Sequence, residues 1–289
     1  MFNGSMILTA TLLGISIGLC LGALGGGGSI ITVPALIYLL DQPMSTAVTQ
    51  SLVIVSISSA TAMLTHASGR RVRWWTGIIL GGLGGAASLA GTALGRLIPA
   101  DTAMTGFACL MLVVAAVLTG RTRPRARDRH QTRDRMLVTS GAPHEDRAAA
   151  PASTSKTANT TVHPLRTAAA IILTGVLVGV LTGFFGVGGG FVIAPALVLI
   201  LRYPMPIAVG TSLLVITINS AAALATLVSH EALDWSIIVP VAVAAIVGSV
   251  AGKFATQKIS DKTLTRMFAA MLIVVAVYVG ARSLALIPH

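Results

Sequence analysis

The chain has 289 residues, of which 54% are hydrophobic and only 10% are charged. Soluble domains usually carry about 25% charged residues, and here the deficit falls in uncharged runs long enough to cross a membrane. The formal charge of +11 does not indicate a nucleic-acid partner, because nine basic residues lie together in 121–164, as in cytoplasmic loops of membrane proteins. We expect an all-α polytopic membrane protein that contacts the lipid bilayer and binds no nucleic acid.

Ten apolar runs follow one another along the chain. They cover 6–24, 29–40, 44–65, 74–98 and 102–120, and then 166–185, 190–201, 205–229, 235–257 and 263–286. The stretch between the two groups is rich in Ala, Ser, Thr, Pro and Arg and has too few large apolar residues to fold alone. The sequence predicts a first transmembrane repeat (1–120), a disordered, basic cytoplasmic linker (121–164) and a second transmembrane repeat (165–289).

The two groups of runs repeat one pattern of residues. Gly18, Gly22, Gly25, Gly27, Gly28 and Pro34 recur at one constant offset as Gly179, Gly183, Gly186, Gly188, Gly189 and Pro195. The same offset relates Ser51, Trp74 and Phe107 to Ser212, Trp235 and Phe268. Because this register continues without a gap over most of each half, we infer that the halves share one fold.

The short runs 29–40 and 190–201 decide how often each half crosses the membrane. A helix of this length spans about 18 Å, against about 30 Å of hydrocarbon. Each run is either a re-entrant half-helix, giving four crossings and parallel halves, or the end of a crossing that starts at the preceding glycines, giving five crossings and inverted halves. Five crossings place Arg71, the linker, Arg202 and most other basic loop residues on one side. We expect inverted repeats of about five helical segments each, with the linker inside, both termini outside, and the short, broken helices at the repeat interface.

Two glycine clusters interrupt the apolar runs at equivalent places. In lipid, non-helical backbone survives only where protein or a water-filled cavity satisfies its polar groups. Paired breaks of this kind are the best pointer in a sequence to a transporter's binding site, and the N-termini of the short helices would direct N–H groups and a positive dipole towards an anion. The clusters predict the following substrate-binding residues: Gly25, Gly26, Gly27, Gly28, Ser29, Gly186, Gly188, Gly189 and Gly190.

The alternative for these glycines is that they only allow helices to pack closely, as small residues do in membranes. We expect that role for a third set in the run 74–98. Its members are Gly81, Gly82, Gly84, Gly85, Gly91 and Gly95.

A second polar set lies in the runs that follow the short helices. Hydroxyl and amide groups can complete the shell of an anion without burying a countercharge, and this predicts binding roles for Gln50, Ser51, Thr211, Ser212 and Asn219. Hydrogen bonding between helices is the alternative, because Ser, Thr, Asn and Gln commonly provide it in membranes.

Ionisable groups are scarce inside the apolar runs. Lys253 lies near the end of its run, where we expect its side chain to reach the membrane interface. His66 and His230 end equivalent runs, which favours solvated positions. Cys20 and Cys109 are expected to be buried free thiols. No run contains a carboxylate pair, a nucleophile constellation or a metal-ligand cluster, so we expect no enzyme activity, no catalytic residue, no metal and no cofactor.

The glycine–proline segments resemble the sulfite exporter TauE/SafE family of membrane permeases. The resemblance rests on GLCLGALGGGGSIITVPAL (18–36) and GVLVGVLTGFFGVGGGFVIAPAL (175–197), followed by AVTQSL (47–52) and AVGTSL (208–213). The first copy differs from the family's usual pattern in having Gln50 where threonine is common. The resemblance implies export of sulfur-containing anions such as sulfite or organosulfonates, with a pocket formed by the two glycine loops and the nearby Thr, Gln and Ser positions.

These observations favour a transporter in the cell inner membrane that works by alternating access, with one half rocking against the other around a small inorganic or organic anion. Two alternatives stay open. One is an uncoupled anion channel or facilitator that uses the same loops, and the other is a non-transporting scaffold that recruits a partner through its basic linker. A homo-oligomer is compatible with each of the three.

Overall fold

The computed structural model describes residues 4–69, 71–95, 97–98, 100–122, 164–185, 190–227, 233–256 and 259–285. Within these residues the chain is helical and contains no strand, which confirms the expected all-α class. The first half supplies α1 (Gly4–Leu24), α2 (Gly27–Leu40), α3 (Met44–Ala67), α4 (Trp74–Gly95) and α5 (Ala100–Thr122). The second half supplies α7 (Pro164–Phe185), α8 (Gly190–Leu199), α9 (Met205–Leu227), α10 (Trp235–Thr256) and α11 (Asp261–Ala285). Most of the predicted linker lies outside the described residues.

Five described helices, α3, α4, α9, α10 and α11, are long and apolar enough to cross a membrane. Their outer faces carry exposed large apolar side chains such as Leu89, Val243 and Val274, which suit a lipid environment. The helices α2 and α8 contain only 14 and 10 residues, which correspond to about 21 and 15 Å at 1.5 Å per residue. The short helices that the sequence predicts are therefore present, and neither α2 nor α8 alone is long enough to span the hydrocarbon layer.

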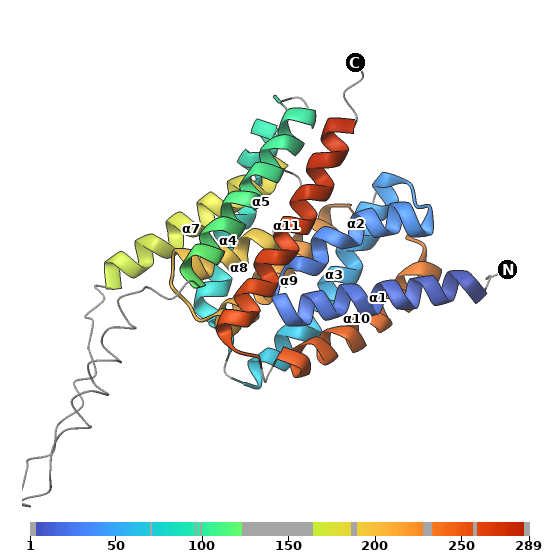
Figure 1. The fold of residues 1–289 in the computed structure, drawn as a ribbon, viewed down its shortest axis with the longest axis horizontal. Coiled ribbons are helices and arrows are strands. Elements are labelled where there is room, and N and C mark those ends of the chain that lie inside the picture. Colours follow the sequence, from blue (N-terminus) through green and yellow to red (C-terminus); the bar gives the residue numbers. More distant parts are fainter. Residues whose placement is uncertain are drawn as a thin grey trace, which may run out of the picture.

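The first helix of each half packs along the fourth helix of the other half. Figure 1 shows α1 beside α10 on one side of the molecule and α4 beside α7 on the other. A Cβ atom added to Gly22 would lie 2.0 Å from the Ser249 carbonyl oxygen, and one added to Gly183 would lie 1.9 Å from the Ser88 carbonyl oxygen. These are equivalent positions of the repeat, so in both pairs the closest approach of two backbones depends on a glycine.

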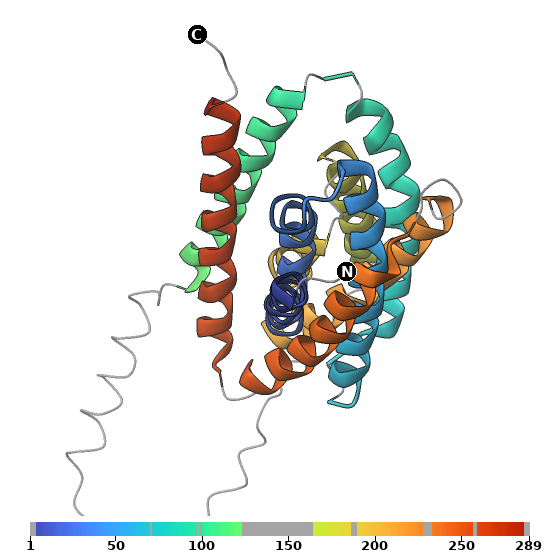
Figure 2. The same ribbon diagram turned by 90° about the vertical axis from the view of Figure 1, so that its right-hand side faces the viewer.

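The third helices of the two halves, α3 and α9, cross at the centre and run in opposite directions. The Ser59 and Thr217 hydroxyl oxygens are 2.9 Å apart near the middle of both helices, while the Arg73 N–H, beyond the end of α3, donates to the Thr211 hydroxyl near the start of α9 over 3.2 Å. The fifth helices, α5 and α11, pair with each other at the edge of the bundle (Figure 2). Inverted halves require such antiparallel pairs, and the inversion across the membrane stays a prediction that these contacts support.

Both short helices end in the same backbone cap. Asp41 and Arg202, at equivalent positions, adopt left-handed conformations with φ of 50° and 55°. The following amides reach back, so that Gln42 N–H donates to Leu36 O over 3.2 Å and Tyr203 N–H donates to Leu197 O over 3.1 Å. This is a Schellman-type ending, which stops a helix and turns the chain. It directs the chain from each short helix into the long third helix.

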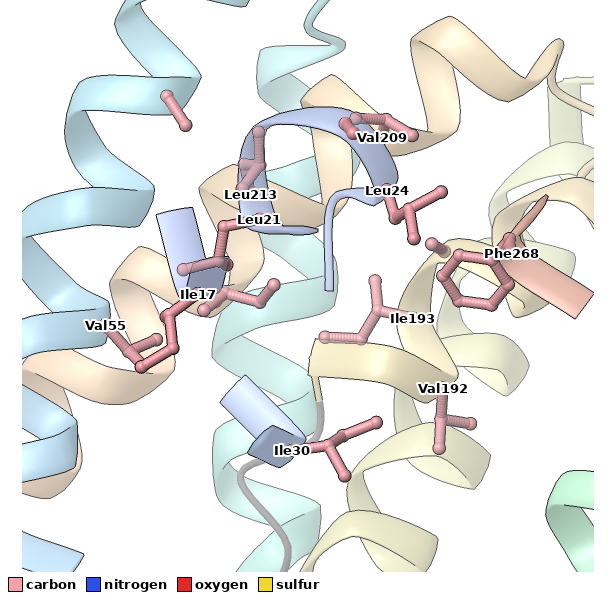
Figure 3. Close-up of a cluster of buried hydrophobic side chains, with 14 of the residues drawn as sticks. Ile17, Leu21, Leu24, Ile30, Val55, Val192, Ile193, Val209, Leu213 and Phe268 are labelled. Carbon is pink, nitrogen blue, oxygen red and sulfur yellow. The ribbon is translucent and has the colours of Figure 1, made fainter. Parts of the chain in front are cut away.

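Apolar side chains fill the space between the two short helices. In the close-up of Figure 3, Ile30 of α2 and Ile193 of α8 belong to one cluster with Leu24, Val209 and Phe268. Each of these side chains is at most 7% exposed. The centre of the molecule is therefore an apolar, closely packed core in this conformation.

Candidate functional site

The first glycine break is docked against a helix of the other half. Gly25 has φ of 74°, which favours glycine, and its N–H donates to Leu21 O over 2.8 Å. The Ser212 hydroxyl of α9 lies 2.7 Å from Gly25 O, to which it donates. A Cβ atom on Gly25 would lie 2.7 Å from the Val209 Cα. The break thus brings together two predicted site residues, Gly25 and Ser212, from different halves.

Of the remaining glycines of the first break, Gly28 lies in tight packing. Gly26 has extended backbone and precedes the first residue of α2, Gly27. A Cβ atom on Gly28 would lie 2.5 Å from the Leu21 Cγ and 2.6 Å from the Ile17 carbonyl oxygen, because α2 folds back along α1. Close packing, which the sequence suggested for the α4 glycines, therefore applies to Gly28 as well. The side chain of Ser29 lies outside the described residues.

The second break is described only at its end. Gly190 is the first residue of α8 and is buried, whereas Gly186, Gly188 and Gly189 lie outside the described residues. The binding role that the sequence predicts for these glycines stays a prediction.

The predicted polar residues fall into two groups at opposite ends of the α3–α9 pair. Thr211 and Ser212 lie near the start of α9, next to the end of α3. Gln50 lies near the start of α3, where its amide nitrogen is 3.3 Å from the Gln42 amide oxygen and its own oxygen is buried without a partner. Ser51 is there too, and its hydroxyl donates to Val48 O over 2.7 Å. At 1.5 Å per residue the two groups are separated by roughly 25 Å, so they do not line one common pocket.

A pocket opens between α4, α7, α8 and α9 and includes the fifth predicted polar residue, Asn219. The pocket is narrow, with a cavity volume of about 10 Å³ for the centre of a water molecule. That is room for about one water molecule. The Asn219 amide oxygen is buried and has no hydrogen-bond partner. The pocket is lined by Leu80, Gly84, Thr174, Gly175, Val178, Gly179, Thr182, Ile193, Ala196, Leu197, Val215 and Asn219.

The equivalent region of the first half is filled by side chains. Leu13 and Leu21 occupy the positions equivalent to Thr174 and Thr182, and both leucines are buried. Ser58 replaces Asn219 and donates to Ile54 O in its own helix over 2.6 Å. The polar lining of the pocket is therefore not repeated at the equivalent positions among the described residues. Sequence reasoning missed Thr174 and Thr182, although their alignment with two leucines in the other repeat is a signal that could have found them.

Two basic residues, His66 and Lys253, are more buried than their positions near the ends of apolar runs suggest. His66, expected at a solvated helix end, is only 2% exposed, because the end of α3 packs against α1 and its Nε2 lies 3.1 Å from Gly22 O. Lys253 is 9% exposed, and its ammonium group hydrogen-bonds to Thr65 O and lies 3.3 Å from the Ser68 hydroxyl oxygen. The expected solvated position of His66 is thus wrong, whereas His230 lies outside the described residues. Of the two thiols expected to be buried, Cys20 is partly buried and Cys109 is exposed, on an outer helix face.

The chain is similar to known membrane proteins over nearly its whole length. The family described as "Sulfite exporter TauE/SafE" matches residues 10–279. A protein of Xylella fastidiosa (strain Temecula1) named "Probable membrane transporter protein" is 32% identical over 274 residues, which is 92% of each chain. "Probable membrane transporter protein YunE" of Bacillus subtilis is 24% identical over 270 residues, covering 91% of this chain and 93% of that protein. No solved structure matches the fold.

Proposed function

The chain belongs to the sulfite exporter TauE/SafE family of membrane transporters, and from that premise we propose that it exports small sulfur-containing anions such as sulfite or organosulfonates by alternating access. The membrane is the cell inner membrane, and the basic linker lies on its cytoplasmic side, in keeping with the excess of Lys and Arg there.

The observation that carries this proposal is the pocket between α4, α7, α8 and α9, which includes the unpartnered amide oxygen of Asn219. A buried polar atom without a partner is rare in a folded protein. Because this oxygen accepts hydrogen bonds, a water molecule or a ligand that carries an O–H group would satisfy it, whereas the NH2 group of the same amide is the part that can donate to an anion. The Thr182 hydroxyl and the Asn219 amide offer neutral donors, and the first turn of α8 adds a positive helix dipole. The Thr174 hydroxyl donates to Ala170 O over 2.6 Å and so presents its acceptor side. Because such a site has no fixed positive charge, it can bind an anion weakly enough for the anion to leave again.

The pocket must widen to hold a tetrahedral or pyramidal oxyanion, since it has room for about one water molecule now. The packing of the helices indicates which parts could move. Because α1 and α3 pack on α10, and α7 and α9 pack on α4, each compact unit contains helices from both halves. We infer that these mixed units, rather than the two halves of the sequence, move against each other at the α3–α9 crossing.

Purified protein in vesicles is expected to show saturable sulfite flux. Loading the vesicles with unlabelled sulfite should accelerate the uptake of labelled sulfite, because a carrier returns faster when its site is occupied. A panel of sulfite, sulfoacetate, sulfate and simple carboxylates would define the substrate class. Flux that rises linearly with concentration, without counterflow, would indicate a pore and contradict alternating access.

Asn219→Ala is expected to lower the rate of sulfite flux at low concentration by about tenfold or more, because a hydrogen bond to a charged ligand contributes about 1.5–3 kcal/mol. Ser58→Ala is the matched control, since it changes the equivalent position in the filled half. Both variants should elute as the wild type in size-exclusion chromatography. Equal losses in the two variants would show that the pocket has no special role.

A further inference from the structure

A buried lysine near the first glycine break has only neutral partners among the described residues. The Lys253 ammonium group lies at the C-terminal end of α3, where Thr65 O and the Ser68 hydroxyl accept its hydrogen bonds. Among the described residues no carboxylate pairs with it. An ionisable residue inside a membrane helix is costly and is by default a candidate for a functional role.

His66 lies beside this lysine and has an unused nitrogen. Its Nε2 lies 3.1 Å from Gly22 O, and since a carbonyl oxygen only accepts hydrogen bonds, Nε2 carries the proton. Its Nδ1 is buried without a partner. In the neutral ring Nδ1 is an acceptor, and a second proton would make it a donor. The charged groups that act on the ring are Arg71, after the end of α3, and Lys253, from α10.

The pair Lys253 and His66 is not repeated at the equivalent positions of the other half. In the repeat, Lys253 is equivalent to Thr92 and His66 to Leu227, so the other half has neither cation. Instead, the Thr92 hydroxyl donates to Gly183 O over 3.3 Å, which is the carbonyl equivalent to that of Gly22. The start of α9, which has a positive dipole, lies at the same end as Arg71 and Arg73. The two repeats therefore differ in charge at the side of the molecule that carries the basic linker.

We propose that Lys253 and His66 form a buried loading site, distinct from the Asn219 pocket, that binds the sulfonate or sulfite group from the linker side together with a proton. The inference rests on the proposed transport function. The anion would exchange the Thr65 and Ser68 contacts of Lys253 for a charge-assisted hydrogen bond. A proton taken up with the anion would turn Nδ1 of His66 into a second donor, so that the buried charges of Lys253 and His66 gain a countercharge.

The alternative is a purely structural role, in which Lys253 only caps the C-terminal end of α3. Cations at a helix C-terminus stabilise it through the dipole and the last carbonyl groups, and the bond to Thr65 O fits that role. The two roles differ in what a mutation changes. Loss of a cap lowers stability alone, whereas loss of a loading site changes the affinity for the anion.

The test measures methanesulfonate binding by calorimetry on the full chain in detergent, because the charge of this anion is constant over the working pH range. Lys253→Gln should weaken binding about 10- to 100-fold, as expected when a charged donor is lost. Thr92→Gln, which changes the equivalent position of the other half, should bind as the wild type does. Repeating the wild-type titration in buffers of different ionisation enthalpy should reveal proton uptake, and His66→Phe should abolish that uptake.

Several results would overturn the loading site while leaving transport intact. One such result is a Lys253→Gln protein that melts at a lower temperature but keeps the counterflow of the wild type and its dissociation constant for methanesulfonate. That result would assign the lysine to capping. If Lys253→Gln does not fold, Lys253→Met, which keeps the length of the chain, takes its place under the same criteria. Wild-type binding without proton uptake would contradict the role of His66. Absence of both binding and flux in the wild type would contradict the proposed function itself.

Discussion

Replacing Gly183 by alanine is expected to destabilise the folded protein severely. The new Cβ would lie 1.9 Å from the Ser88 carbonyl oxygen and 2.7 Å from the Ser88 carbonyl carbon. These atoms belong to the backbone of α4, so they can move away only if α4 and α7 separate along their length. Overpacking of this kind costs about 1–3 kcal/mol or more, which corresponds to a fall of roughly 2–12 °C in melting temperature. Thermal unfolding in detergent measures the effect, and sulfite flux should fall with the amount of folded protein.

Gly82→Ala is the matched control, since it lies in α4 and a Cβ atom there would meet nothing within 4 Å. Alanine also has the higher helix propensity, so this variant should melt at or slightly above the wild-type temperature. Gly22→Ala, at the equivalent position of the first half, should behave like Gly183→Ala because its Cβ would lie 2.0 Å from Ser249 O. A stable Gly183→Ala protein would mean that α4 and α7 do not pack as described.

The sequence was sufficient to predict the helices and the all-α fold class. The apolar run 74–98 corresponds to α4, and the short runs 29–40 and 190–201 correspond to α2 and α8. The helix α2 begins two residues before its predicted start, and α8 ends two residues before its predicted end. The runs are recognisable because lipid requires long uncharged stretches. The left-handed caps at Asp41 and Arg202 were not predicted, because neither residue type is the glycine that usually marks such an ending.

The pairing of the helices could not be predicted from the sequence. Gly18 and Gly22 form a small-xxx-small pattern, as do Gly179 and Gly183, and such a pattern indicates a tight helix interface without naming its partner. The partner in each case is the fourth helix of the other half. Because these pairs join the two halves, we propose that the movement occurs between units of mixed origin. Rocking of one whole half against the other, which the repeat suggested, stays a prediction.

The candidate site was predictable only in part, for two physical reasons. First, Ser212 and Gly25 are far apart in sequence, and their hydrogen bond depends on how α9 docks on the first break. Second, the repeats match at the glycine clusters, whereas Asn219, Lys253 and His66 are replaced by Ser58, Thr92 and Leu227 at the equivalent positions. The differences between aligned repeats therefore carry more information about function here than the shared glycines do.

A disulfide between α3 and α9 is expected to stop transport reversibly. The Ser59 and Thr217 hydroxyl oxygens are 2.9 Å apart, so cysteines at both positions should reach the S–S length of about 2.0 Å with a small adjustment. The bond would tie together the two mixed units at their central crossing. Oxidation of Ser59→Cys/Thr217→Cys, in a chain with Cys20 and Cys109 replaced by alanine, should reduce sulfite flux and counterflow to less than roughly a tenth, and reduction should restore them.

The matched control places the same chemistry where no relative movement of the units is expected. The Ser260 and Thr263 hydroxyl oxygens are 3.0 Å apart within one short segment at the start of α11, so oxidised Ser260→Cys/Thr263→Cys should transport as the reduced protein does. Mass spectrometry establishes how completely each bond forms. A fully crosslinked Ser59→Cys/Thr217→Cys protein that still shows normal saturable flux would mean that the crossing is rigid, and the moving interface would then have to be sought along α2 and α8. Because a static pore needs no such movement, arrest by this one bond is the result that separates a carrier from a channel.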